Sequence, residues 1–159
     1  MSLLRFLMLL SLIVWVGALI FFPVVAQTAF SVLPSTHLAG LVVARSLKIL
    51  HWMGIVSGLA FLVSSMLFNR LTSGAAHVFA ARHLLICLML ALTLVSQFGI
   101  IPRMDALRLS LGGDIASVPV TNPARAQFDA LHLWSTRVEG GVLLLGLVAA
   151  YLTASALRS

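Results

Sequence analysis

Four apolar stretches along the chain are each long enough to cross a lipid bilayer. They run over about residues 3–26, 47–68, 83–101 and 131–157, and most polar residues lie between them. A bilayer core of about 30 Å requires roughly 20 apolar residues in helical form. Because lipid offers the backbone no hydrogen-bond partners, such stretches must be helical. The pattern predicts a single domain, an all-α antiparallel bundle of four transmembrane helices.

The polar segment between the third and fourth stretches predicts further structure. Pro102 is expected to end the third helix, because proline removes a backbone donor. Beyond Pro102, apolar residues recur at helical spacing: Met104, Leu107 and Leu111. This spacing predicts a short amphipathic helix at the membrane surface over Met104–Leu111. Asn122 followed by Pro123 is typical of a helix start, so the fourth helix is expected to begin there.

The first apolar stretch resembles a secretory signal peptide in part. It follows a short basic segment that ends at Arg5, and Val24-Val25-Ala26 resembles a cleavage site. However, the apolar run between these points is longer than the 7–15 residues of a usual signal-peptide core. We therefore expect the first helix to be an uncleaved membrane span.

Composition agrees with a membrane protein and argues against binding to nucleic acid. Hydrophobic residues make up 61% of the chain and charged residues only 9%. A soluble domain carries about 25% charged residues. The net charge is +6, but the ten Lys and Arg residues are scattered, without the basic patch that a nucleic-acid interface requires. The single cysteine, Cys87, lies in an apolar run and excludes an intrachain disulfide.

Basic residues between the spans bear on orientation in the membrane. The side with both termini would carry four of them: Arg5, Arg70, Arg82 and Arg158. The opposite side would carry six: Arg45, Lys48, Arg103, Arg108, Arg125 and Arg137. The count favours a cytoplasmic location for the second group. However, Arg125 and Arg137 lie near Asp129 and Glu139 in the sequence, which is consistent with a structural role. Short connections are typical sites of cytoplasmic charge, so we expect both termini to be cytoplasmic.

A polar stripe at the start of the fourth helix is the first candidate for chemistry. Its members are three or four residues apart and therefore share one helix face: Arg125, Asp129, His132, Ser135 and Glu139. One interpretation is a face toward water or a partner helix, with Arg125 and Asp129 as an ion pair. The other is a functional site in which Asp129 orients His132, with Glu139 deeper in the membrane.

Two histidines are candidates for a metal or haem site. In an antiparallel bundle, His51 in the second span and His132 in the fourth are expected at similar depth. Two such histidines can ligate a haem or, with Glu139, a metal ion. No H-x-x-x-H or C-x-x-C-H motif is present, and a membrane histidine can equally form a hydrogen bond to a neighbouring helix.

His132 and Glu139 are expected to face the interior of the bundle rather than lipid. A charged group at mid-bilayer costs about 2.5–3.5 kcal/mol on insertion scales, so Glu139 is expected to be protonated, to pair or to face a polar cavity. Candidate partners are Lys48, His51 and Gln97, of which His51 is preferred. His37 and His77 lie in connections and are expected to be solvated, whereas His83 is expected to be a surface anchor.

Gly54 and Gly58 form a G-x-x-x-G pattern in the second span. Small residues let helices approach closely in lipid. The pattern predicts close packing within the chain or self-association.

A set of residues in several segments forms a recognisable pattern: Gly17, Phe21, Val25–Phe30, Ala39-Gly40, Ile101–Met104, Arg108, Phe128, Leu131-His132 and Ser135. In these residues the sequence resembles bacterial members of the transmembrane-protein-205-like family, a four-helix membrane domain of unknown function (DUF4149). The chain departs from the family pattern at Gln27, in place of a proline, and at Glu139, in place of an asparagine. The resemblance implies a multi-pass protein of the bacterial inner membrane. A eukaryotic relative linked with tolerance of metal-containing drugs favours transport or metal handling.

Two functions follow from these observations. The first is a non-enzymatic subunit or scaffold that binds other membrane proteins. The second is a protein that binds or transports a metal, haem or small cation at the polar site between spans two and four. No nucleophile–base constellation, phosphate loop or metalloprotease motif indicates an enzyme.

Overall fold

The computed structural model describes residues 2–74 and 80–156, and helices make up nearly all of this part. The long helices are α1 (Ser2–Val32), α2 (Thr36–Ser73), α3 (Ala81–Val95), α4 (Ile101–Ser110) and α5 (Pro123–Ala156). A π-helical turn, η1 (Ser96–Ile100), joins α3 to α4, and a 3₁₀ turn, η2 (Ile115–Ser117), precedes α5. Four helical stretches are long and apolar enough to cross a membrane, so the predicted all-α membrane fold is confirmed.

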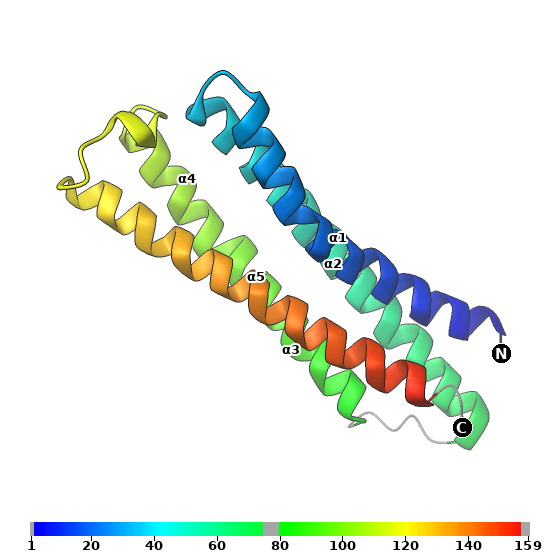
Figure 1. Ribbon diagram of the computed structural model, residues 1–159. Coiled ribbons are helices and arrows are strands. Elements are labelled where there is room, and N and C mark those ends of the chain that lie inside the picture. The colour runs from blue at the N-terminus through cyan, green and yellow to red at the C-terminus, as the bar shows by residue number, and fades with distance from the viewer. Residues whose placement is uncertain (1, 75–79, 157–159) are drawn as a thin grey trace.

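The helices form two hairpins that lie against each other. Figure 1 shows α1 and α2 side by side over their lengths, and α5 alongside α3 and α4. In this view α1 and α2 run in opposite directions, and α5 runs opposite to the continuous stretch of α3 and α4. At the end where α1 turns into α2 and α4 leads to α5, the two pairs lie further apart than at the opposite end.

Helices α1 and α2 extend well beyond the predicted apolar spans. Only residues 33–35 separate them. The side chain of Ser35 accepts a hydrogen bond from the backbone N–H of Leu38, at 3.2 Å, and so caps the first turn of α2. At its other end α2 stops at Gly74, whose φ of 70° is a left-handed conformation that favours glycine. Polar residues outside the apolar spans are therefore helical too.

Pro102 does not end the third helix, contrary to the prediction. The helical stretch continues from Ala81 to Ser110. Proline lacks a backbone N–H, and its ring conflicts with the carbonyl four residues earlier in a regular α-helix. The π-turn directly before Pro102 changes this register, because the N–H of Ile101 donates to the carbonyl of Ser96, five residues back. The wider turn accommodates the proline.

The region of the predicted amphipathic helix over Met104–Leu111 is helical as far as Ser110, but it is the end of this continued helix rather than a separate segment. Gly112 and Gly113 terminate it with φ values of 78° and 92°.

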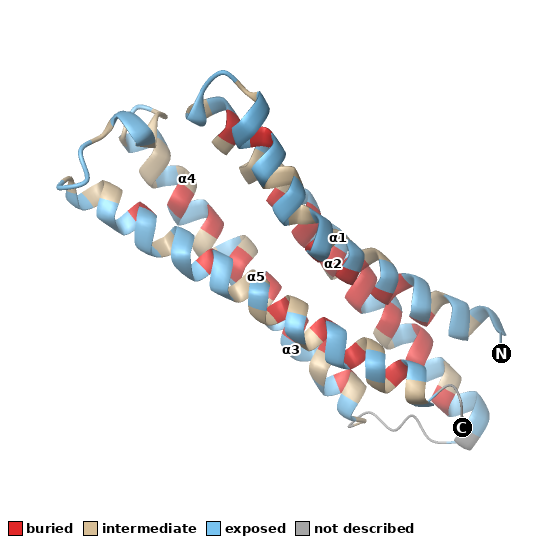
Figure 2. Ribbon diagram, in the orientation of Figure 1, coloured by how far each residue is buried: buried red, intermediate tan, exposed pale blue. Residues whose placement is uncertain are grey.

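The core lies between the helices, and the outer surface is apolar. Trp15, Phe61, Met89 and Val142 are almost completely buried. Figure 2 shows buried residues along the faces where helices meet and exposed residues on the outer faces. Many of the exposed residues are large and hydrophobic, for example Tyr151 at 70%. An apolar exterior of this extent suits contact with lipid.

The G-x-x-x-G pattern is used within the chain. A Cβ atom on Gly54 would lie 2.7 Å from Cε2 of Trp15 on α1. A Cβ atom on Gly58 would lie 2.7 Å from side-chain atoms of Trp15 and Leu90. These glycines therefore let the Trp15 ring pack directly against α2, which is the intrachain alternative of the prediction.

Candidate functional site

A buried histidine–glutamate pair connects α2 with α5. His51 Nε2 lies 2.7 Å from Glu139 Oε1, and His51 Nδ1 lies 2.8 Å from Gln97 Oε1. The His51 side chain is fully buried, whereas 14% of the Glu139 side chain is exposed. The predicted interior position of Glu139 and its pairing with His51 are confirmed. Gln97, the third member, comes from the π-turn.

Glu139 lines a cavity between the two hairpins. The cavity has a volume of about 710 Å³ and is walled by α1, α2, α4 and α5 together with the loop before α5. Its wall on α5 extends from Arg125 to Leu143, so Glu139 lies one turn before the last lining residue. His51 does not line the cavity, and Glu139 therefore stands between the cavity and the histidine.

Most of the cavity wall is apolar. Helix α1 contributes only apolar residues: Leu19, Phe22, Pro23, Ala26 and Phe30. Charged residues of the wall lie mainly toward the end near the loop: Asp105, Arg108, Asp114 and Arg125. The inner end is apolar except for Glu139.

The polar stripe of α5 faces this cavity for the most part. Arg125, His132, Ser135 and Glu139 all line it, whereas Asp129 does not. The predicted pair of Arg125 and Asp129 is present, with 3.6 Å between Nε and Oδ2. The second interpretation gave Asp129 the role of orienting His132, but the carboxylate is 56% exposed and pairs with Arg125.

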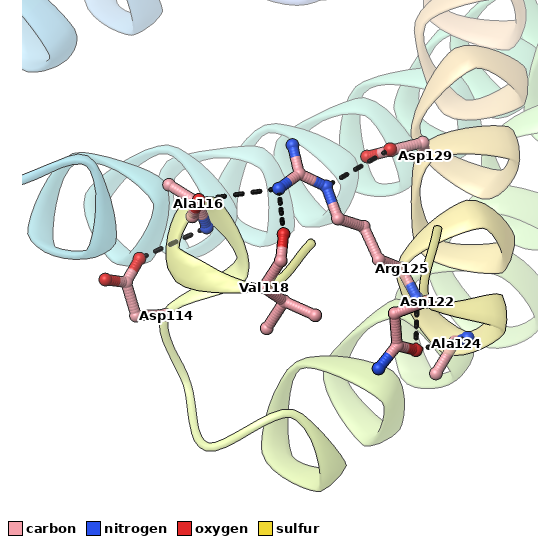
Figure 3. Close-up of polar contacts among 7 residues, drawn as sticks. All are labelled: Asp114, Ala116, Val118, Asn122, Ala124, Arg125 and Asp129. Atoms are coloured by element: carbon pink, nitrogen blue, oxygen red, sulfur yellow. Dashed lines mark hydrogen bonds and ion pairs between the residues drawn. The ribbon is translucent and has the colours of Figure 1, made fainter. Parts of the chain in front are cut away.

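Arg125 also ties the loop before α5 to the helix. Figure 3 shows its guanidinium directed at the backbone carbonyls of Ala116 and Val118, as well as toward Asp129. The side chain of Asn122 caps α5 by accepting from the N–H of Ala124, at 2.9 Å. The loop end of the cavity is thus built by side chains of the first helical turns.

Ionic contacts join α2 to α4 beside the cavity. Lys48 Nζ lies 2.6 Å from Asp105 Oδ2, and Arg108 Nη1 lies 3.4 Å from Asp105 Oδ1. The Arg108 guanidinium also stacks over the Phe128 ring, 5.5 Å from its centroid. Lys48, a candidate partner for Glu139, pairs with Asp105 instead. Asp105 was not among the residues predicted for the site, although it is an acid in a helical segment that also contains Arg108.

The predicted metal and haem sites are not assembled. His132 is exposed and lies parallel to Phe128, with 6.4 Å between ring centroids. It precedes Glu139 by seven residues, which places it about 10 Å away along the helix and so at a different depth from His51. Among the described residues, no three His, Cys, Asp or Glu side chains are grouped to hold a metal ion. Of the three residues predicted to bind a metal ion, His51, His132 and Glu139, only His51 and Glu139 are in contact.

Two other histidines are not where the sequence predicted. His37, expected to be solvated, is half-buried, lines the cavity and has Nδ1 2.7 Å from the carbonyl oxygen of Gly113. His83, expected to be a surface anchor, is 2% exposed and has Nε2 2.7 Å from the Ser65 hydroxyl. Each contacts a residue outside its own helix, Ser65 on α2 for His83 and Gly113 in the loop after α4 for His37, so local composition gave no sign of these contacts. His77 lies outside the described residues.

The cluster around His83 stands at the opposite end of the bundle from the cavity. Arg82 donates to Ser65 Oγ at 3.2 Å and to Asn69 Oδ1 at 2.7 Å. These hydrogen bonds join α3 to α2.

Comparison with known proteins identifies the family. The family model described as a domain of unknown function, DUF4149, matches residues 10–111, which is more than half of the chain. The chain belongs to this family. The DUF4149 match includes His51, Gln97 and Asp105 but ends before α5, which carries Glu139. No curated protein and no solved structure matches the chain.

Proposed function

We propose that the protein binds small organic cations with apolar substituents in the cavity between the two hairpins, and that the Glu139 carboxylate recognises their charge. The observation that carries the proposal is the position of this one acidic side chain at the inner, apolar end of the cavity, away from the charged residues near the loop.

The dimensions and chemistry of the cavity suit such a ligand. Sites for small molecules have volumes of about 300–1,000 Å³ and mostly apolar walls with few polar groups, and this cavity of about 710 Å³ falls in that range. An ionisable residue inside a membrane is costly and marks a ligand or proton pathway by default.

An organic cation fits the wall better than a metal ion. Hard metal ions such as Ca²⁺ require several oxygen ligands around them, and Glu139 provides a single carboxylate. An apolar organic cation needs one opposite charge and a surface for its apolar groups. The wall contributed by α1 provides that surface.

We also propose that the protein lies in the bacterial cytoplasmic membrane, with both termini in the cytoplasm. Several basic residues on the cavity side are paired with acids: Lys48 and Arg108 with Asp105, and Arg125 with Asp129. These pairings support a structural role for those charges rather than a role in orientation.

The second candidate is a non-enzymatic subunit or scaffold of a membrane assembly. Its support is the exposed apolar surface, for example at Leu144 and Tyr151, which can contact a partner protein as well as lipid. It requires no ligand in the cavity. No catalytic role is proposed for either candidate.

Equilibrium binding of tetraphenylphosphonium to the purified protein in detergent distinguishes these functions. The probe is an apolar monovalent cation, and tetraphenylborate is an anion of the same shape. We expect saturable binding of the cation and a loss of at least about tenfold in affinity in Glu139→Gln, a difference of about 1.4 kcal/mol. The Coulomb attraction of unit charges 4 Å apart, about 4 kcal/mol at an effective dielectric of 20, exceeds this.

Asp129→Asn is the matched control, because it removes an exposed carboxylate of α5 that does not line the cavity. It should bind the cation as the wild type does, and Glu139→Gln should not weaken tetraphenylborate binding, because the carboxylate does not attract an anion. Equal cation affinity in Glu139→Gln and the wild type contradicts cation recognition. Absence of saturable binding favours the scaffold.

A further inference from the structure

We infer that the His51–Glu139 pair holds one exchangeable proton, which it releases when a cation binds, so that ligand binding is coupled to proton release. This inference rests on the proposed function. It adds a mechanism that the cavity alone does not imply.

With the Gln97 oxygen toward the ring, the hydrogen-bond geometry assigns a proton to the pair. Both ring nitrogens of His51 then face oxygen atoms, Gln97 Oε1 at 2.8 Å and Glu139 Oε1 at 2.7 Å. In this orientation of the amide, Oε1 only accepts, so Nδ1 carries a hydrogen. A second hydrogen must then lie between Nε2 and Glu139, either on the imidazole or on the carboxyl group. The pair therefore holds one proton more than a neutral histidine beside a carboxylate, and its net charge is zero.

Burial explains why the pair keeps this proton while the cavity is empty. His51 is fully buried and only 14% of the Glu139 side chain is exposed. An uncompensated carboxylate in such surroundings is costly, and a group avoids the cost by taking up a proton.

A cation in the cavity replaces the proton as the compensating charge. Its positive charge can lie next to Glu139, which borders the cavity, while His51 lies behind it. The exchange balances: one proton leaves to water, one monovalent cation enters, and the site with its ligand again has zero net charge.

Gln97 can satisfy the histidine after the proton has left. Neutral His51 then carries one N–H, which donates to Glu139, so Nδ1 becomes an acceptor. A half-turn of the Gln97 amide presents its NH₂ group to Nδ1 in place of Oε1. Gln97 belongs to the π-turn, a form of helix that is frequent at functional sites.

The surrounding charges lie mainly in one cluster. Lys48 on α2 and Arg108 on α4 share the single carboxylate of Asp105, which leaves one unbalanced positive charge in that cluster. This charge repels an entering cation, and the Glu139 carboxylate offsets that repulsion. His132 on α5 lies about 10 Å away along the helix, the π-turn contributes the neutral Gln97, and α1 presents only apolar residues to the cavity.

Calorimetric titration of the wild-type protein with tetraphenylphosphonium tests the inference directly. The measured enthalpy is compared in buffers of different ionisation enthalpy at one pH, and the slope gives the number of protons released per bound cation. We expect release of about one proton per cation near neutral pH. Saturable binding with a slope of zero overturns proton exchange but leaves the proposed function intact. Absence of binding contradicts the proposed function, and the inference fails with it.

Two variants locate the proton, once circular dichroism and gel filtration show that they are folded. Glu139→Gln should release no proton with whatever cation it still binds, whereas Asp129→Asn should release as many as the wild type. Undiminished release in Glu139→Gln would assign the proton to another group and overturn the inference. The ¹⁵N resonances of the His51 ring give a second measurement, because loss of a proton should convert one ring nitrogen from N–H to an unprotonated acceptor.

Discussion

Position 51 shows how one side chain can satisfy two others in the middle of a membrane bundle. The ring nitrogens of His51 reach Gln97 and Glu139 from opposite edges of the imidazole, and neither contact is open to solvent on the histidine side. Removal of the histidine therefore leaves two partly buried polar groups, Gln97 and Glu139, without their partner. Amide substitution of the glutamate keeps a polar group in place.

This difference predicts unequal losses of stability. His51→Leu should lower the free energy of unfolding by about 1–3 kcal/mol, the cost of leaving a buried polar group unpaired. Glu139→Gln should cost less than about 1 kcal/mol, since the amide can still hydrogen bond to Nε2. Unfolding in a detergent of graded denaturing strength provides the comparison. A larger loss in Glu139→Gln than in His51→Leu would contradict the assigned roles.

The contact of Trp15 with Gly54 provides a second residue-scale prediction. Gly54→Ala places a methyl group against the indole ring and forces it to move, which should destabilise the fold by about 1–3 kcal/mol. Gly17→Ala is the control, because nothing lies within 4 Å of a Cβ atom at that position. It should be neutral or stabilising by up to about 1 kcal/mol. Thermal unfolding of both variants in the same detergent checks the pair, and equal midpoints would argue against tight packing at Gly54.

The free-energy cost of placing a side chain in lipid predicted contacts of individual residues better than residue type did. Glu139 could be placed because a charge in lipid must find a partner. His37, His83 and Asp105 could not, since each binds a group far away in sequence. His132 was paired wrongly with His51 because α2 begins at Thr36, well before the predicted apolar span, so His51 lies further along its helix than His132 does along α5.

Among the helices, the join between α3 and α4 positions residues of the candidate site. The π-turn at Ser96–Ile100 carries Gln97 toward His51 and lets the helix continue past Pro102 to Asp105 and Arg108. The apolar pattern was sufficient to predict the four long helices. A π-turn adds one residue to a single turn, a change too local to alter hydrophobic periodicity, so it was not predictable.

The end of α4 and the start of α5 should face the same side of the membrane. Ala106 on α4 and Ala126 on α5 are both exposed and lie on either side of the loop that joins these helices. Single cysteines at these positions, in a Cys87→Ala background, should react with a membrane-impermeant thiol reagent from one common side of oriented vesicles. Reaction from opposite sides would mean that the helical stretch Ala81–Ser110 does not cross the membrane as one span.

Across the whole molecule, the two hairpins are joined by polar contacts on either side of an apolar cavity. Lys48 with Asp105, His37 with Gly113, and His51 with Glu139 each connect the α1–α2 hairpin to the α4–α5 hairpin. The existence of a polar site between the second and fourth spans could be predicted from the sequence. Its cavity could not, because its walls come from four helices whose separation depends on packing.

If this cavity is the ligand site, a bound cation should protect a cysteine in the cavity wall from chemical modification. Thr136 is exposed on the cavity wall, three residues before Glu139, whereas Ala106 is exposed outside the cavity. Each is replaced by cysteine in a Cys87→Ala background, and the rate of modification by a small methanethiosulfonate is measured with and without tetraphenylphosphonium. We expect slower modification at position 136 with the cation bound and an unchanged rate at position 106. Saturable cation binding that leaves the rate at position 136 unchanged would contradict this assignment of the site.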